Sequence, residues 1–292
     1  MHEAVYLGQV LVNGLGVGCI YGLIGIGFCV IYNASGIVNF AQGAFVMLGG
    51  MVTFVLLNSL GLPIVVAAPL ATVFVAALGV IIERLVVRPL WDRNATMFVM
   101  ILATLAAQIV IERATLIVVG DQPKSIPMFT DLPPIRIAGI SIGYQILWII
   151  GTSLILIGLL ALFFQRTLVG RAMRACAINR DAAALQGIPV ARMLALSFAL
   201  SAALGAIAGI LLTPTQFTAF NVGTPFAISG FIAAIVGGFG RPFGAFLGGI
   251  ALGLTQALAV YALGSGLKNV AALSVLLVFL FLRPSGILGT AK

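Results

Sequence analysis

The chain has 292 residues, of which 62% are hydrophobic and only 8% are charged. Its mean hydropathy of +1.22 excludes an ordinary soluble domain. The net charge of +8 is attributed to membrane topology rather than to nucleic-acid binding, because basic residues in short loops are retained in the cytoplasm. Apolar runs of about 20 residues, enough to cross a bilayer, recur from end to end. The composition therefore predicts an all-α integral membrane protein, a single polytopic domain over residues 1–292.

The apolar segments are predicted at 8–32, 37–58, 62–83, 95–119, 142–165, 193–213, 226–240, 243–264 and 269–282. The segment at 226–240 is short for a full span, so eight spans with a re-entrant piece remain an alternative to nine. Two polar loops are longer, at 120–141 and 166–192. The second carries five arginines and is predicted to be cytoplasmic, which places 120–141 and the N-terminus outside and the C-terminus inside.

Glycines recur at a spacing of four. Small residues at this spacing allow two helices to approach closely in a membrane, so we expect these glycines at helix contacts. They are Gly14, Gly18, Gly22, Gly240, Gly244 and Gly248. The stretch "GAFVMLGG" at 43–50 also resembles "GAFLGG" at 244–249, and each follows a polar break. Interrupted segments paired in this way indicate two inverted repeats, with chance similarity as the alternative.

Several kinds of catalytic chemistry are missing. None of the lysines stands in a phosphate-binding Gly-Lys-Ser/Thr motif. The acid inside a predicted span, Glu112, is followed by Arg113, and we expect an interfacial pair rather than a proton relay. One histidine and three cysteines without ligand spacing predict no metal site. The sequence therefore indicates no enzyme and no cofactor on this chain. If the chain takes part in active transport, a separate protein would have to supply the energy.

Residues 170–188, "GRAMRACAINRDAAALQGI", are polar and basic within this apolar chain. Arg171 and Arg174 share one helical face, with Met173, Cys176 and Ala177 expected opposite them. Either Asn179 or Asp181 can cap a second short helix over 182–186, which includes Ala183 and Leu185. Gly187 then supplies the residue after its end and Pro189 prevents continuation. A loop that touches anionic lipid explains the charge but not the capped helix, so we predict a docking element for another protein.

This loop resembles the coupling segment of permease subunits in the branched-chain amino acid ABC importer family, which also contains urea and amide permeases. Five further stretches are similar to the family in the same order. They are "YGLIGIGFCVIY" at 21–32, "GIVNFAQGAFVMLGG" at 36–50, "ERLVVRPL" at 83–90, "AAIVGGFGRPFGAFLGG" at 233–249 and "LRPSGILG" at 282–289. The chain is most similar to the shorter of the two permeases in such systems.

The resemblance implies a multi-pass protein of the bacterial inner membrane. A second permease, as a heterodimer with this chain, would form the path for a branched-chain or related amino acid. Two cytoplasmic ATPases would bind ATP and Mg, and a periplasmic binding protein would deliver the substrate. Urea or short amides are alternative substrates, and a passive channel for a small polar solute is the alternative from another class. The implied ATPase-coupling residues are Arg171, Arg174, Asn179, Asp181, Ala183, Leu185 and Gly187.

Polar breaks indicate where a substrate path would run. In "NFAQG" we expect Asn39 to cap a helix and the longer Gln42 to face a water-filled cavity, because irregular backbone is not tolerated against lipid. Arg241, in the matching break, either reaches the cytoplasmic interface or lines the exit. The family often has histidine at the position of Gln42 and small residues around 241–243, so the exact substrate is left open. The path candidates are Asn39, Gln42, Gly43, Gln216, Gly237 and Gly238.

Overall fold

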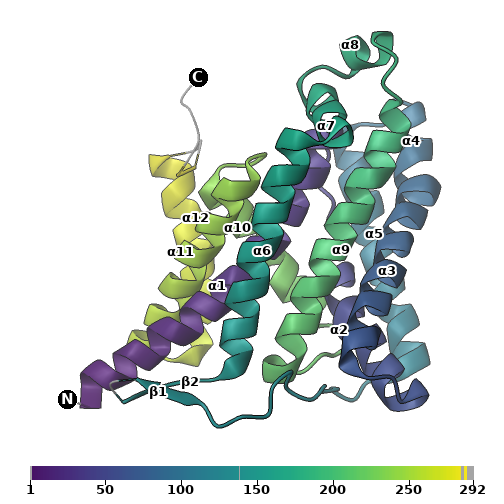
Figure 1. Ribbon diagram of the computed structural model, residues 1–292. Coiled ribbons are helices and arrows are strands. Elements are labelled where there is room, and N and C mark those ends of the chain that lie inside the picture. The colour runs from purple at the N-terminus through teal and green to yellow at the C-terminus, as the bar shows by residue number, and fades with distance from the viewer. Residues whose placement is uncertain (1, 138, 284–285, 288–292) are drawn as a thin grey trace.

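The computed structural model describes residues 2–137, 139–283 and 286–287, and it is a bundle of helices (Figure 1). In chain order the first helices are α1 (His2–Ser35), α2 (Gln42–Leu60), α3 (Ile64–Ile82), α4 (Arg88–Asp92), α5 (Met97–Val119), α6 (Tyr144–Arg166) and α7 (Leu168–Ile178). They are followed by α8 (Arg180–Leu185), α9 (Val190–Gln216), α10 (Gly223–Gly237), α11 (Pro242–Leu263) and α12 (Lys268–Leu282). A π-helical turn, Glu83–Val87, joins α3 to α4, and a 3₁₀ turn, Ser265–Leu267, precedes α12.

Eight helical segments within the described residues are long and apolar enough to cross a membrane. Helix α10 has 15 residues and is too short to be counted with them. The all-α polytopic bundle is therefore confirmed, with eight spans and one shorter buried helix rather than nine full spans.

Helix α1 is the centre of the bundle. It packs against α9, α10 and α11, and 89% of the residues in its most apolar stretch are buried. Helices α3, α5, α6 and α12 surround this centre and expose most of their apolar side chains. Such an outward apolar surface is what a bundle immersed in lipid requires, because lipid tails are as apolar as the side chains that face them.

The glycines of α1 lie against α11. A Cβ atom on Gly18 would lie 2.8 Å from the Cα of Ile250, and one on Gly14 would lie 2.6 Å from the Cβ of Ala257. Gly22 meets Phe246 in the same way, so these three positions leave no room for a side chain. On the other side of α11, Gly244 and Gly248 contact Gly237 of α10. The expectation that Gly240 lies at a helix contact is wrong. Gly240 lies in the turn between α10 and α11 with φ +87°.

The loop at 120–141 contains structure that the sequence did not predict. Strands β1 (Ile135–Ile137) and β2 (Ile140–Ile142) form an antiparallel hairpin, with Arg136 opposite Ser141. The Gln9 side chain holds this hairpin to α1, because its Nε2 donates to the Ser141 carbonyl at 2.8 Å and its Oε1 accepts from the Ser141 N–H at 2.9 Å.

The two ends of the bundle separate the loops as the charge pattern predicts. Helices α4, α7 and α8 and the end of α12 lie at one end, and β1, β2 and the start of α1 lie at the other (Figure 1). The absolute orientation in the membrane stays a prediction. The prediction that the C-terminal Lys292 lies inside concerns a residue outside the described part of the chain.

Candidate functional site

The polar loop folds as two short helices with side-chain caps. Thr167 caps α7 by accepting from the Gly170 N–H at 2.9 Å, and Asn179 caps α8 by accepting from the Ala182 N–H at 3.0 Å. Gly187 has φ +79°, the left-handed conformation that ends helices at low cost for glycine. The predicted capped helix is therefore confirmed, with Asn179 as the cap and Asp181 in the first turn.

The face that α8 presents differs from the prediction. Ala183 is 4% exposed and points inward, whereas Leu185 is 88% exposed. Ala182 and Ala184 are also exposed, so α8 presents these two alanines and Leu185 to the outside, beside the exposed Asp181 of its first turn. On α7, Arg171 and Arg174 are exposed and Met173 and Cys176 are buried as expected, while Ala177 is exposed.

Arg180 could not be distinguished by sequence from the other four arginines of its loop. Its guanidinium donates to the carbonyl of Ser35 at the end of α1, and it lies over the Trp91 ring at 4.3 Å from the centroid. Burial lowers the pKa of Arg180, while the neighbouring Asp181 raises it. Arg180, the first residue of α8, thus connects this helix to α1 through a charge-assisted hydrogen bond and to α4 through a cation–π contact.

A second connection fixes the other end of this loop. Glu83, buried at the π-helical turn, accepts from Arg88 Nε at 2.9 Å and from Arg88 Nη2 at 3.1 Å. Arg88 Nη2 also donates to the carbonyl of Ala191 at 3.1 Å, near the start of α9. The segment that contains α8 is therefore attached to the bundle on both sides.

Helices α2 and α10 begin inside the bundle, where their first turns meet. A Cβ atom on Gly43 would lie 2.6 Å from the carbonyl oxygen of Gly223, so the two backbones are in direct contact. By helical rise, Gly43 lies about 25 Å from Leu60 at the far end of α2. Gly223 likewise lies about 21 Å from Gly237. This contact, which we call the mid-membrane junction, therefore lies inside the bundle, away from the far ends of both helices.

Asn39 stands at this junction and is fully buried. Its Oδ1 accepts from the Ala41 N–H at 3.1 Å, which forms an Asx turn before α2. The expected helix cap is therefore wrong, because the N-cap residue of α2 is Ala41 and the helix has no side-chain cap. Its Nδ2 has no hydrogen-bond partner within the described residues. An unpaired buried donor is costly, so Asn39 is a polar group without full compensation at the centre of the packing.

The expectation that Gln42 faces a cavity is wrong for this structure. Gln42 is 0% exposed, and its Oε1 accepts from the Ser201 hydroxyl at 2.6 Å. Its Nε2 donates to the Ser201 carbonyl at 3.2 Å. Gly27 and Gly205 leave the space that this side chain fills. Gln42 therefore joins α2 to α9, which only the tertiary packing could show.

A polar stripe on α5 completes the junction. Thr104 accepts from the Phe40 N–H at 3.2 Å, and Gln108 Nε2 contacts the Thr224 hydroxyl at 2.6 Å. Glu112 accepts from Gln108 at 3.0 Å and from Thr224 at 2.8 Å. Arg113 lies over the Phe220 ring instead, so the predicted pair between Glu112 and Arg113 is absent. The spacing of four among these three α5 residues was a signal that our sequence reasoning missed.

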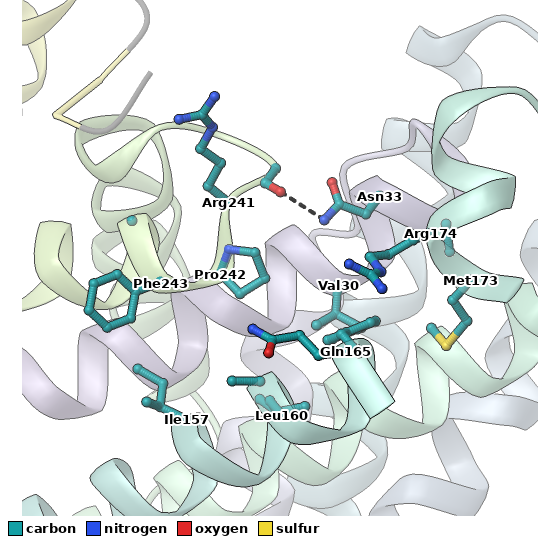
Figure 2. Close-up of a pocket in the computed structure, with 15 residues that line it drawn as sticks. Val30, Asn33, Ile157, Leu160, Gln165, Met173, Arg174, Arg241, Pro242 and Phe243 are labelled. Carbon is teal, nitrogen blue, oxygen red and sulfur yellow. Dashed lines mark hydrogen bonds between the residues drawn. The ribbon is translucent and has the colours of Figure 1, made fainter. Parts of the chain in front are cut away.

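A cavity of about 490 Å³ lies beneath α7, between α1, α6 and the turn that joins α10 to α11. Its floor includes Ile157 and Leu160, and Asn33 Nδ2 donates to the Gly240 carbonyl at its rim, 2.7 Å away. Figure 2 shows the Arg174 side chain directed toward the cavity, whereas that of Arg241 points away from it. The cavity is mostly apolar, with polar groups at the edge.

The other path candidates do not form one site. Gly237 packs on Gly244, and Gly238 is buried with φ +108° where α10 ends. Gln216 is exposed at the opposite end of the bundle, as the last residue of α9. Asn39, Gln42 and Gly43 are thus brought together, and the remaining three candidates are not. Among the described residues no group of His, Cys, Asp or Glu is arranged to hold a metal ion.

Comparison with known proteins gives the family. A family model described as the permease component of the branched-chain amino acid transport system matches residues 10–282. The chain is 37% identical to the high-affinity branched-chain amino acid transport system permease protein BraD of Pseudomonas aeruginosa, over 99% of this chain and 98% of that protein. It is 32% identical to LivH of Escherichia coli K12, a permease protein of the same description, over 98% and 97% of the two chains.

A more distant relative is the probable LivH of Methanocaldococcus jannaschii, which is 31% identical over 91% of this chain and 88% of that protein. The solved structure of PsaBC from Streptococcus pneumoniae in complex with Fab has a similar fold, with TM-score 0.51 and 13% identity over 95% of this chain and 92% of that one. The chain therefore belongs to the family of branched-chain amino acid permease components. It is a multi-pass membrane transport subunit.

Proposed function

We propose that this chain is a permease subunit of an ATP-driven importer of the inner membrane, and that a branched-chain or related amino acid is its substrate. A second permease subunit completes the path, and a periplasmic binding protein delivers the amino acid. ATP and Mg are bound by two cytoplasmic ATPase subunits. The family and the shared names of the relatives support this proposal.

The observation that carries the proposal is the outward face of α8. A short capped helix with two exposed alanines and one fully projecting leucine is suited to a groove on another protein. Arg171 and Arg174 flank it with positive charge on α7. In the proposed orientation, with the N-terminus outside and the C-terminus inside, this face lies in the cytoplasm, where an ATPase subunit can bind it.

The attachment of α8 suggests how ATP hydrolysis would open the path. A movement of α8 reaches the end of α1 through Arg180 and Ser35. Residues 36–41 then lead directly from α1 to the first turn of α2 at the mid-membrane junction. Because Asn39 and Gly43 are fully enclosed there, a substrate passes only if α2 and α10 separate.

The test is uptake into proteoliposomes that contain the complete set of proposed subunits. We expect leucine-type amino acids to accumulate only when ATP and the binding protein are both present. Ala184→Arg should abolish uptake by blocking the docking face, while Arg166→Gln, an exposed change outside α8, should not. Uptake by this chain without ATPases would indicate a passive channel, and uptake of urea or amides alone would indicate the alternative substrates.

A further inference from the structure

A second groove lies on the outer surface of the bundle, between the end of α3, α4 and the beginning of α9. Its volume is about 450 Å³. Its lining consists of Val80, Arg84, Arg88, Ala191, Arg192, Ala195 and Leu196. Three guanidinium groups, from the π-helical turn, α4 and α9, therefore meet at a groove whose remaining lining is apolar.

The groove has an excess of positive charge. Arg88 is held in place by the carboxylate of Glu83 and by the Ala191 carbonyl. The side chains of Arg84 and Arg192 make no hydrogen bond or ion pair with any described residue. Glu83 pairs with Arg88 alone, and Asp92 at the end of α4 is the other acid nearby. One guanidinium group is therefore already ordered, and two are available for an anion. Guanidinium groups bind phosphate oxygens in a geometry that favours two parallel hydrogen bonds.

The position of the groove along the helix is informative. The helical run from Ile64 to Asp92 has 29 residues, whereas about 20 residues cross the hydrocarbon core. Its last third, which includes Arg84 and Arg88, therefore reaches the level of the lipid headgroups. Below the arginines the surface is apolar, because Ile81 is 48% exposed and Leu196 is 40% exposed.

We propose that this groove binds one anionic phospholipid. The phosphate lies among Arg84, Arg88 and Arg192, and an acyl chain lies along Val80 and Leu196. An acidic surface of a cytoplasmic subunit could satisfy the arginines, but it could not reach the apolar part of the groove below the headgroup level. A lipid satisfies both parts at once. This site is separate from the mid-membrane junction and from the exposed residues of α8, although Arg88 and Ala191 also attach the segment that contains α8.

The experiment uses the full-length chain, with any subunits that co-purify, in nanodiscs of phosphatidylcholine to which phosphatidylglycerol is added. Native mass spectrometry counts the lipid that stays bound. The variant carries Arg84→Gln and Arg192→Gln and keeps Arg88, which holds Glu83. The matched control carries Arg93→Gln and Arg283→Gln, two exposed arginines outside the groove. Inorganic phosphate without phosphatidylglycerol is the third arm.

We expect the unmodified chain and the control to retain a phosphatidylglycerol molecule that the groove variant binds about 30-fold more weakly, as loss of two surface charges predicts. Equal loss of lipid in variant and control would show diffuse surface charge and overturn the proposal. Stabilisation by inorganic phosphate alone would show a simple anion site and overturn it as well. Loss of a co-purifying subunit in the groove variant, with lipid retained, would assign the groove to a protein partner instead.

Discussion

The guanidinium of Arg180 donates a hydrogen bond to the main-chain carbonyl of Ser35, the last residue of α1. The same group lies over the ring of Trp91, so one side chain at the start of α8 holds two other helices. Helix C-terminal carbonyls lack partners within their own helix, and a cation is favourable there. The contact therefore joins the proposed docking helix to the segment that leads into the mid-membrane junction.

The first prediction concerns this contact. Arg180→Gln should lower the amount of amino acid imported per ATP hydrolysed by about tenfold, because α8 would move without displacing α1. Arg180→Lys should have an intermediate effect, since it keeps the charge but not the planar stacking on Trp91. Uptake and phosphate release are measured on the same proteoliposomes. An unchanged ratio in Arg180→Gln, beside an unchanged ratio in the Arg166→Gln control, would remove Arg180 from the coupling mechanism.

The second prediction concerns Gln42. Because both ends of its amide group are bonded to Ser201, Gln42→Ala should destabilise the contact between α2 and α9 by about 1–3 kcal/mol. Thermal unfolding in detergent measures this change. In a double-mutant cycle, Ser201→Ala should add less to Gln42→Ala than it costs alone. Strictly additive effects would mean that the two side chains do not interact, contrary to the structure.

The third prediction concerns the attachment near α9. Glu83→Ala leaves Arg88 without its carboxylate partner and should lower stability by about 2 kcal/mol, less than for a fully buried pair because Arg88 is 32% exposed. The double variant Glu83→Ala with Arg88→Met should recover part of this loss, since no uncompensated charge remains. If the loss of stability in the double variant equals the sum of the losses in the two single variants, Glu83 and Arg88 do not stabilise the protein through their interaction.

Local features of the fold were predictable from the sequence, and tertiary ones were not. The cap at Asn179 and the stop at Gly187 depend on neighbouring residues in the chain, so the pattern of "NRDAAALQG" is sufficient to predict them. The spacing of Gly14, Gly18 and Gly22 likewise predicted a close helix contact on this face of α1, but not that α11 is the partner.

Burial could not be read from the pattern. From the sequence Gln42 was expected to face a cavity, but in the structure it bonds to Ser201 of α9. Ala183 could not be distinguished from its exposed neighbours, because its burial depends on how α8 packs on the bundle. Arg180 could not be distinguished from the other arginines of its loop, because its partners Ser35 and Trp91 are distant in sequence. The hairpin of β1 and β2 also depends on a distant residue, Gln9.

The fourth prediction concerns orientation. The native thiols of Cys19, Cys29 and Cys176 are buried, and burial raises the pKa of Cys176, so these thiols should react poorly with any reagent. Exposed cysteines introduced at Ser125 and Gln186 are therefore the useful probes. An impermeant thiol reagent should label Ser125→Cys in intact cells and Gln186→Cys only after lysis. The opposite pattern would invert the topology and place α8 where no ATPase can reach it.

The most direct test of the account is a cross-link from the exposed tip of α8. A photoactivatable reagent is attached to Leu185→Cys in the chain co-expressed with its ATPase and second permease subunits, and adducts are identified by mass spectrometry. The account predicts that the ATPase subunit is the main adduct, and that the same reagent on Ser125→Cys, in the loop at the opposite end of the bundle, gives no ATPase adduct. Adducts of Leu185→Cys that contain lipid or the second permease, with no ATPase adduct, would contradict the assignment of α8 as the docking helix.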